Sequence, residues 1–131
     1  MNVVELQPTQ ESPSRARDAI SGFKGQLDDR TYAELQLLVS ELVTNAVRHA
    51  SLAPDDSILL EVSWTGERLR VEVSEAGVGF TPGTPKPTPD GASGWGLYIA
   101  EHVADRWGVT RSEGTNRVWA EWDLGSAAKT G

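Results

Sequence analysis

Two short segments with alternating apolar and polar residues constrain most strongly what this chain can fold into. Residues 58–64 (ILLEVSW) and 69–75 (LRVEVSE) have the composition of β-strands, and the four residues between them, TGER, suit a hairpin turn. In the second segment Leu69, Val71 and Val73 alternate with polar residues, so one face of the strand is expected to be exposed to solvent. The pattern predicts an antiparallel hairpin that needs cover on its other face.

Helical patterns elsewhere in the chain can provide that cover. Residues 14–27 and 32–50 space their apolar side chains as an α-helix does. Thr31 followed by Glu34 has the form of a capping box, which predicts that the second helix begins after Thr31. A third helix is predicted from Leu97 to Trp107, with Gly108 as its C-cap glycine. The apolar stripe of the second helix consists of Leu35, Leu38, Val39, Leu42, Ala46 and Ala50.

Further strands are predicted at residues 3–6, 108–113 and 117–124, which gives the order β-α-α-β-β-loop-α-β-β. This order predicts an α+β fold, a two-layer α/β sandwich with a mostly antiparallel sheet and helices on one face. The length favours a single domain, here residues 1–125, with a flexible tail at 126–131. The Pro- and Gly-rich stretch 77–94 is predicted to be a long functional loop.

Composition excludes several classes of function. The chain has no cysteine, which rules out disulfides, thiolate metal sites and cysteine nucleophiles and fits a cytoplasmic protein. The net charge of −7, with no basic cluster, argues against nucleic acid as a partner. No segment approaches the ~18 consecutive apolar residues of a membrane span. Protein or small-molecule partners are therefore expected.

The segment ELVTNAVRHA, residues 41–50, holds the first candidate site. At 100° per residue, Glu41, Asn45 and Arg48 line one border of the apolar stripe. A carboxylate and an amide at positions i and i+4 are neighbours on a helix, and oxygen ligands of this kind suit Mg²⁺. Such pairs are also common on solvated helix edges, so the pattern alone leaves both interpretations open.

Three glycine-containing motifs follow. In EAGVGF (75–80), directly after a strand, Gly77 and Gly79 let the backbone approach a flat ligand. In SGWGL (93–97), at a predicted helix start, free N–H groups attract anions. Gly114-Thr115 marks the last turn. Each motif alone is equally explained as a strand exit, a hinge or a plain turn, and only their order is informative.

In that order, the motifs resemble those of the GHKL ATPases, which have the Bergerat ATP-binding fold. Within that family the chain is most similar to anti-sigma-factor serine/threonine kinases of the actinobacterial type. The resemblance extends over nearly the whole chain and is carried by ELVTNAVRHA, EAGVGF, GWGL, ADRWGV and GTNRVWAEW. It implies ATP and Mg²⁺ as cofactors.

The resemblance also implies roles for individual residues. Glu41 is similar to the family's general base, which polarises a water or a target serine hydroxyl, and Asn45 to its Mg²⁺ ligand. Residues 81–93, within the loop 77–94, would form the ATP lid. Thr115 resembles the threonine that completes the adenine pocket. The nucleotide-binding positions implied in this way are Asn45, Arg48, Glu75, Gly77, Gly79, Gly94, Trp95, Gly96, Leu97 and Thr115.

Glu75 departs from the family pattern, which has Asp before A-G-x-G to accept a hydrogen bond from the adenine amino group. The additional methylene moves the carboxylate by about 1.5 Å, enough to weaken that bond or to require a shifted nucleotide.

Three functions are consistent with the resemblance. The first is an ATP-dependent kinase that phosphorylates an anti-anti-sigma (STAS-type) protein and holds a sigma factor, as a homodimer. The second is a protein-binding regulator on the same fold, with nucleotide binding weakened or lost through Glu75. The third is a sensor whose nucleotide occupancy, rather than phosphoryl transfer, sets its affinity for a partner.

Overall fold

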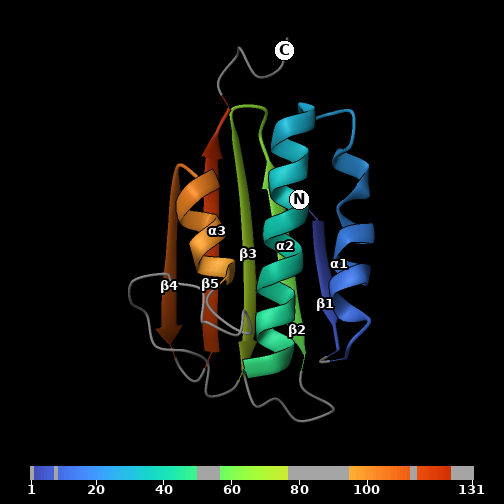
Figure 1. The fold of residues 1–131 in the computed structure, drawn as a ribbon, viewed down its shortest axis with the longest axis vertical. Coiled ribbons are helices and arrows are strands. Elements are labelled where there is room, and N and C mark those ends of the chain that lie inside the picture. Colours follow the sequence, from blue (N-terminus) through green and yellow to red (C-terminus); the bar gives the residue numbers. More distant parts are fainter. Residues whose placement is uncertain (1, 8, 50–56, 77–94, 113–114, 125–131) are drawn as a thin grey trace.

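The part of the chain that the structure describes folds into a five-stranded antiparallel sheet with its helices on one face (Figure 1). The computed structural model describes residues 2–7, 9–49, 57–76, 95–112 and 115–124. In chain order the elements are β1 (Asn2–Leu6), α1 (Ser12–Ala19), the 3₁₀ helix η1 (Ser21–Phe23), α2 (Asp29–His49), β2 (Ile58–Trp64), β3 (Arg68–Ala76), α3 (Trp95–Val103), β4 (Arg106–Ser112) and β5 (Thr115–Asp123). The predicted α+β two-layer sandwich and its element order are confirmed.

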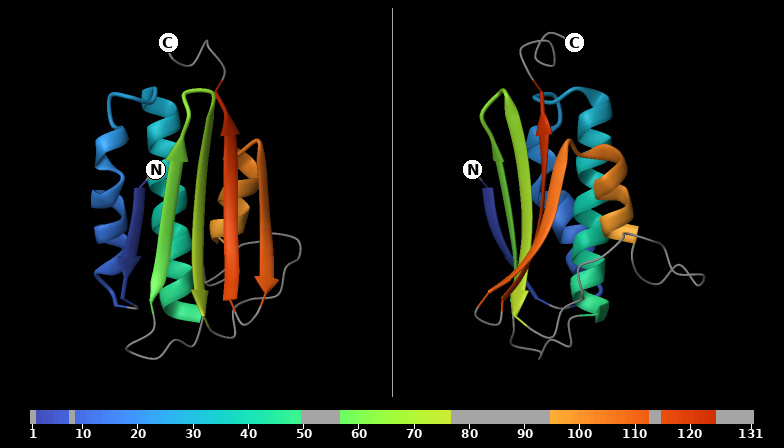
Figure 2. Two further views of the ribbon diagram at one scale, coloured as in Figure 1. Left: turned by 180° about the vertical axis from the view of Figure 1, so that it is seen from behind. Right: turned by 90° about the vertical axis from the view of Figure 1, so that its left-hand side faces the viewer.

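The strands lie in the order β1-β2-β3-β5-β4, and every neighbouring pair is antiparallel. The two layers are clearest edge-on, with the sheet on one side and the helices on the other (Figure 2). The last strand in the sequence, β5, lies between β3 and β4 and pairs with both.

The core fills the space between the sheet and α2. Alternation along the strands puts every second residue on the helix-covered face, as the hairpin pattern predicted. The buried strand residues on this face include Ile58, Leu60, Val62, Leu69, Val71, Val73, Val118, Ala120 and Trp122. The residues of α2 that pack against them are Leu35, Leu38, Val39, Leu42, Val43 and Ala46.

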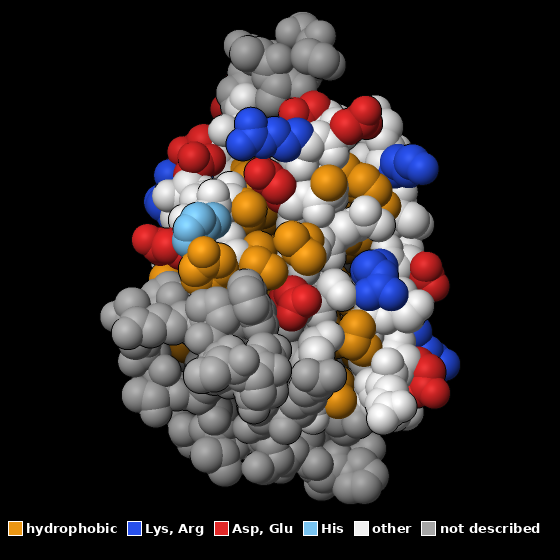
Figure 3. Space-filling view, in the orientation of Figure 1, with side chains coloured by type: hydrophobic (Ala, Val, Ile, Leu, Met, Phe, Trp, Pro, Cys, Tyr) orange, Lys and Arg blue, Asp and Glu red, His pale blue; other side chains and the backbone are white. Residues whose placement is uncertain are grey.

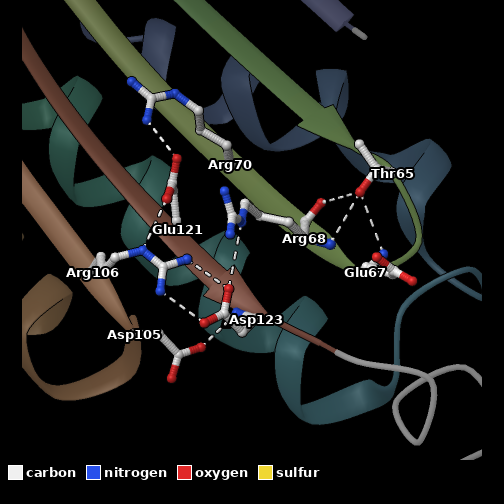
Figure 4. Close-up of polar contacts among 8 residues, drawn as sticks. All are labelled: Thr65, Glu67, Arg68, Arg70, Asp105, Arg106, Glu121 and Asp123. Atoms are coloured by element: carbon white, nitrogen blue, oxygen red, sulfur yellow. Dashed lines mark hydrogen bonds and ion pairs between the residues drawn. The ribbon is translucent and has the colours of Figure 1, made fainter.

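The hairpin turn between β2 and β3 closes as its residues predict. The Thr65 backbone N–H donates to the Arg68 carbonyl at 3.0 Å. The Thr65 hydroxyl accepts from the Arg68 N–H at 3.2 Å (Figure 4). Gly66 has φ +92°, a conformation that glycine adopts without steric cost. Thr65 and Gly66 therefore hold the register of the two strands from this end.

The prediction of one helix over residues 14–27 is wrong. α1 spans Ser12–Ala19 and stops at Ile20, and the 3₁₀ helix of residues 21–23 follows. Gly25 then has φ +89°, which an α-helix cannot contain. Ile20, Phe23 and Leu27 are buried as their spacing suggested, but they reach the core from a turn.

The predicted capping box at Thr31 is also wrong, because α2 begins at Asp29. The Asp28 side chain accepts a hydrogen bond from the Thr31 N–H at 3.2 Å, which is the bond an N-cap residue makes. Glu34 instead contacts Arg30 at 3.4 Å and accepts from the indole of Trp122 at 3.2 Å.

The third error concerns Trp107 and Gly108. α3 ends at Val103, and both residues lie in β4 rather than at the end of a helix. Trp107 pairs with Ala120 and Gly108 with Trp119. Gly108 is a glycine because the Trp119 ring lies across it: a Cβ there would lie 2.7 Å from Trp119 Cζ2.

The helix-covered face carries hydrophobic side chains with acidic and basic ones distributed among them (Figure 3). Among the described residues, the large apolar side chains that are exposed to solvent are Leu37 of α2, at 49% exposure, and Val3 of β1, at 53%. None of the described helices is long and apolar enough to cross a membrane.

Candidate functional site

The C-terminal ends of α2 and β3 and the N-terminal end of β5 lie at one end of the molecule, the lower end in Figure 1, and the N-terminal end of α3 points towards it. They come together because β3 and β5 are paired antiparallel neighbours, while α2 and α3 pack on the same face of the sheet. The site residues predicted from the sequence come from these four ends and from the segments that join them.

Glu41 and Asn45 lie one turn apart in the last turns of α2. Asn45 is only 8% exposed, whereas Glu41 is half-buried. A buried amide among Leu42 and Ala46 is enclosed by protein, so the solvated-edge interpretation does not hold for Asn45. Burying an amide carries a cost unless its groups are engaged, which is typical of a residue that holds a ligand or a neighbour.

The side of α2 that faces the start of α1 differs from the border that carries Glu41 and Asn45. The Thr44 hydroxyl donates to the Ser40 carbonyl of its own helix at 2.7 Å. Thr44 and Val47 line a cavity of about 400 Å³ together with residues 9, 10 and 13, which precede and begin α1. Thr44 is therefore adjacent to Asn45 in the sequence but belongs to a different surface.

Glu75 is the buried acid of the site. It lies next to the end of β3 and is 5% exposed. The register pairs it with Ile58 of β2 and Asn116 of β5, so all three share the helix-covered face of the sheet. Glu75 therefore lies at the end of β3, on the face that α2 covers. Its part in receiving the purine base, which the family resemblance implies, remains a prediction.

Asn116 was not among the predicted site residues, yet it is 3% exposed and lies directly across from Glu75. Thr115, which was, is half-buried and pairs with Ala76. Since neighbouring residues of a strand point to opposite faces, the register directs Thr115 away from the face that holds Glu75. The sequence signal for the buried position of Asn116 was that it continues the every-second-residue series of Val118, Ala120 and Trp122.

Trp95, Gly96 and Leu97 form the first turn of α3. The predicted phosphate-binding segment therefore ends in a helix N-terminus, where unpaired backbone N–H groups and the helix dipole favour anions. Gly77, Gly79, Gly94 and the lid at 77–94 lie outside the described residues, as does the predicted tail at 126–131. Arg48 lies in the last turn of α2.

A network of ion pairs occupies the uncovered face of the sheet (Figure 4). Arg70 and Arg106 both contact Glu121, at 2.8 and 3.1 Å, and Arg106 also holds Asp123 at 2.6 Å. The hydrogen bond from Arg70 and, after it, that from Arg106 lower the pKa of Glu121 below its ordinary value of 4.5. Arg106 lowers the pKa of Asp123 in the same way. These residues tie β3, β4 and β5 together and take no part in the site.

The fold is that of a GHKL-type ATPase domain. The profile of the histidine kinase-like ATPase domain family matches residues 6–122, and the chain belongs to this family. It is 30% identical over 127 residues to the anti-sigma F factor of Pasteuria penetrans, covering 88% of this chain and 84% of that protein.

Solved structures agree on the fold. The RsbU and RsbW domains of a Mycobacterium tuberculosis protein match 94% of this chain with a TM-score of 0.67 at 16% identity. The histidine kinase domain of a blue-light activated histidine kinase from Erythrobacter litoralis matches 91% with a TM-score of 0.61 at 28% identity. A second structure of that kinase matches 89% with a TM-score of 0.63 at 27% identity. The chain spans 32%, 62% and 42% of these three structures, respectively.

Proposed function

We propose that this chain is an ATP-dependent serine/threonine protein kinase that acts as an anti-sigma factor and phosphorylates an anti-anti-sigma partner. The observation that carries the proposal is the Glu41–Asn45 pair on α2, at the end of the sheet where Glu75 is buried. The likeness to an anti-sigma F factor supports the choice of partners. A sigma factor and an anti-anti-sigma (STAS-type) protein are the proposed binding partners, with the chain acting as a homodimer.

Asn45 fits the proposed role of Mg²⁺ ligand. Its amide oxygen is a hard donor, and its burial restricts the side chain. The described residues contain no group of three or more His, Cys, Asp or Glu that could hold a metal unaided. A site with a single protein oxygen suits Mg²⁺, which completes its shell with phosphate oxygens and water. When bound there, the ion would neutralise charge that develops on the phosphates.

Glu41, one turn before Asn45, is the proposed general base. Its carboxylate would accept the proton of a partner's serine hydroxyl while that oxygen bonds to the γ-phosphorus of ATP. At the same time the bond between the γ-phosphorus and the oxygen that links it to the β-phosphorus would break, and ADP would leave with this linking oxygen. Half-burial suits this role, because the carboxylate has to meet a hydroxyl that arrives from another protein.

Titration with Mg-ATP followed by transfer of labelled phosphate to a STAS-type protein tests the proposal. Asn45→Ala should weaken Mg-ATP binding at least tenfold, without rescue by additional Mg²⁺. Glu41→Gln should keep binding within a few-fold and reduce transfer by a factor of ~10² to 10⁴. Thr44→Ala is the matched control on α2 and should change neither, because its hydroxyl bonds within its own helix.

A folded chain that binds no nucleotide at millimolar concentration would refute the kinase proposal and leave a regulator that acts by protein contact. Binding that shifts partner affinity without phosphate transfer, in the unaltered chain, would instead indicate a nucleotide sensor. Light scattering at several concentrations tests the homodimer separately.

A further inference from the structure

The cross-strand position shared by Glu75 and Asn116 holds two polar side chains that are both more than nine-tenths buried, at 5% and 3% exposure. The β3–β5 register is continuous from the pair Arg68 and Asp123 to the pair Ala76 and Thr115, without a bulge. Strict alternation therefore applies along both strands, and Glu75 and Asn116 lie on the same, helix-covered face.

Directly opposed residues of an antiparallel pair have Cβ atoms about 4.5–5.5 Å apart, so a glutamate and an asparagine at such a position can touch. The other described strand neighbours of Glu75 on this face are apolar: Ile58 directly across on β2, and Val73 one alternation further along β3. Arg111 of β4 pairs with Asn116 on its far side, two strands away from Glu75. A carboxylate in such surroundings needs hydrogen-bond donors. Among the strand neighbours of Glu75 itself, Asn116 is the one whose side chain carries an N–H donor.

We propose that Asn116 is a positioning residue that holds the Glu75 carboxylate in place for the exocyclic amine of adenine. This inference rests on the nucleotide binding proposed above. The Asn116 amide would donate to one carboxylate oxygen and leave acceptor capacity on Glu75 for the base. Glutamate has one more rotatable bond than the aspartate usual in this family, and a donor on the neighbouring strand fixes that additional torsion.

The same geometry separates the roles of Asn116 and its neighbour. Arg117, the next residue of β5, is exposed on the opposite face and pairs with Ser74 of β3, so it cannot hold Glu75. Asn116→Ala and Arg117→Ala are thus a matched pair of truncations, one residue apart on one strand, for which opposite outcomes are expected.

Calorimetric titration with Mg-ATP and Mg-ITP tests the inference. The two nucleotides differ at the group that Glu75 would contact, because ITP carries a carbonyl oxygen in place of the amine. Asn116→Ala should weaken ATP binding about tenfold and bring the ATP and ITP affinities closer together. Arg117→Ala should leave the ATP affinity and the ATP-to-ITP ratio unchanged. Asn116→Thr, which keeps a donor at this position, should recover part of the ratio.

The Glu75→Asp background distinguishes positioning from general damage to the pocket. Asn116→Ala should have a smaller effect on ATP affinity there, because the shorter carboxylate has less freedom for Asn116 to restrict. Circular dichroism of each variant shows whether it is folded, and Asn116→Thr replaces Asn116→Ala if the latter is not.

Three results would overturn the inference. If the unaltered chain binds ATP but Asn116→Ala keeps its ATP-to-ITP ratio, or if Arg117→Ala alone lowers the ratio, the assignment of Asn116 is wrong while the proposed function stands. If the folded, unaltered chain binds neither nucleotide, both the inference and the proposed function fail.

Discussion

Replacing Gly108 by alanine tests the packing of β4 against β5. A Cβ at Gly108 would lie 2.7, 2.8 and 2.9 Å from Cζ2, Cε2 and Nε1 of the Trp119 indole. These separations are about 1 Å shorter than an optimal carbon–carbon contact. The Arg70 guanidinium carbon lies 4.8 Å from the ring centroid, so a movement of the ring also disturbs this cation–π contact. The clash therefore has to displace either the ring or β4.

Two opposing terms set the size of the effect. Forcing a methyl group into a filled site costs about 1–3 kcal/mol. Replacing glycine by alanine where the backbone permits it returns about 0.4–1 kcal/mol, because the unfolded chain loses freedom. The net expectation for Gly108→Ala is a loss of about 1–2 kcal/mol in the free energy of unfolding. For 131 residues this lowers the melting temperature by about 4–7 °C.

Thermal unfolding followed by circular dichroism measures this loss, and a double-mutant cycle identifies its cause. In a Trp119→Val background the ring is absent, so Gly108→Ala should become neutral or stabilising. Gly22→Ala is the control: it has no atom within 4 Å of the new Cβ and should not destabilise. If Gly108→Ala is equally destabilising with and without the Trp119 ring, the close approach is not the reason for glycine at this position.

Three further outcomes are expected. Asp28→Ala removes the side-chain cap on the Thr31 N–H and should cost about 1 kcal/mol in chemical denaturation, whereas Asp28→Asn should keep most of that stability; equal losses would contradict the cap. Leu42→Ala, at a core position 3% exposed, should cost about 2–5 kcal/mol, and a loss below 1 kcal/mol would show that α2 is not packed as described. Glu121→Gln tests the ion pair with Arg70. Because the pKa of Glu121 in the folded protein lies below its ordinary value of 4.5, its stabilising effect is complete above about pH 4.5 and is lost as the pH falls further. The difference in stability between parent and variant should therefore shrink below pH ~4.5, and a constant difference would count against this account.

Regular periodicity made most of the fold predictable. The strand predicted at 58–64 has the observed bounds, and the strand predicted at 69–75 is extended by one residue at each end. Alternation of apolar and polar residues is set by burial on one face, and that burial is what the sheet requires. The apolar stripe of α2 was equally predictable from the sequence, because a helix of that length has to turn one continuous face to the core.

The boundaries were less predictable, for physical reasons specific to each place. Trp107 continues the apolar spacing of α3 and also fits the alternation of β4, so the sequence there satisfies both periods. Ile20, Phe23 and Leu27 keep helical spacing although the chain leaves the helix at Ile20, since a 3₁₀ turn can deliver the same side chains to the core.

The candidate site shows a similar division. The motif on α2 could be found because Glu41 and Asn45 are close in the sequence. The neighbour of Glu75 could not be found by distance along the chain, because Asn116 reaches it only through the β3–β5 register. Thr115 was assigned from its motif, and the register directs its side chain to the uncovered face of the sheet. Extending the alternation of buried residues back from Val118 predicts the face on which Asn116 is observed.

The place of β5 in the sheet also determines when this protein can fold during synthesis. β4 pairs with β5 alone, and β3 remains an open edge until β5 is inserted beside it. A nascent chain that has emerged only as far as β4 therefore exposes one strand without a partner and another with half its backbone groups unpaired, a state prone to association with other chains. Asn116 lies on β5 itself, so the pairing of β5 with β3 completes the sheet and the proposed base pocket in the same folding step.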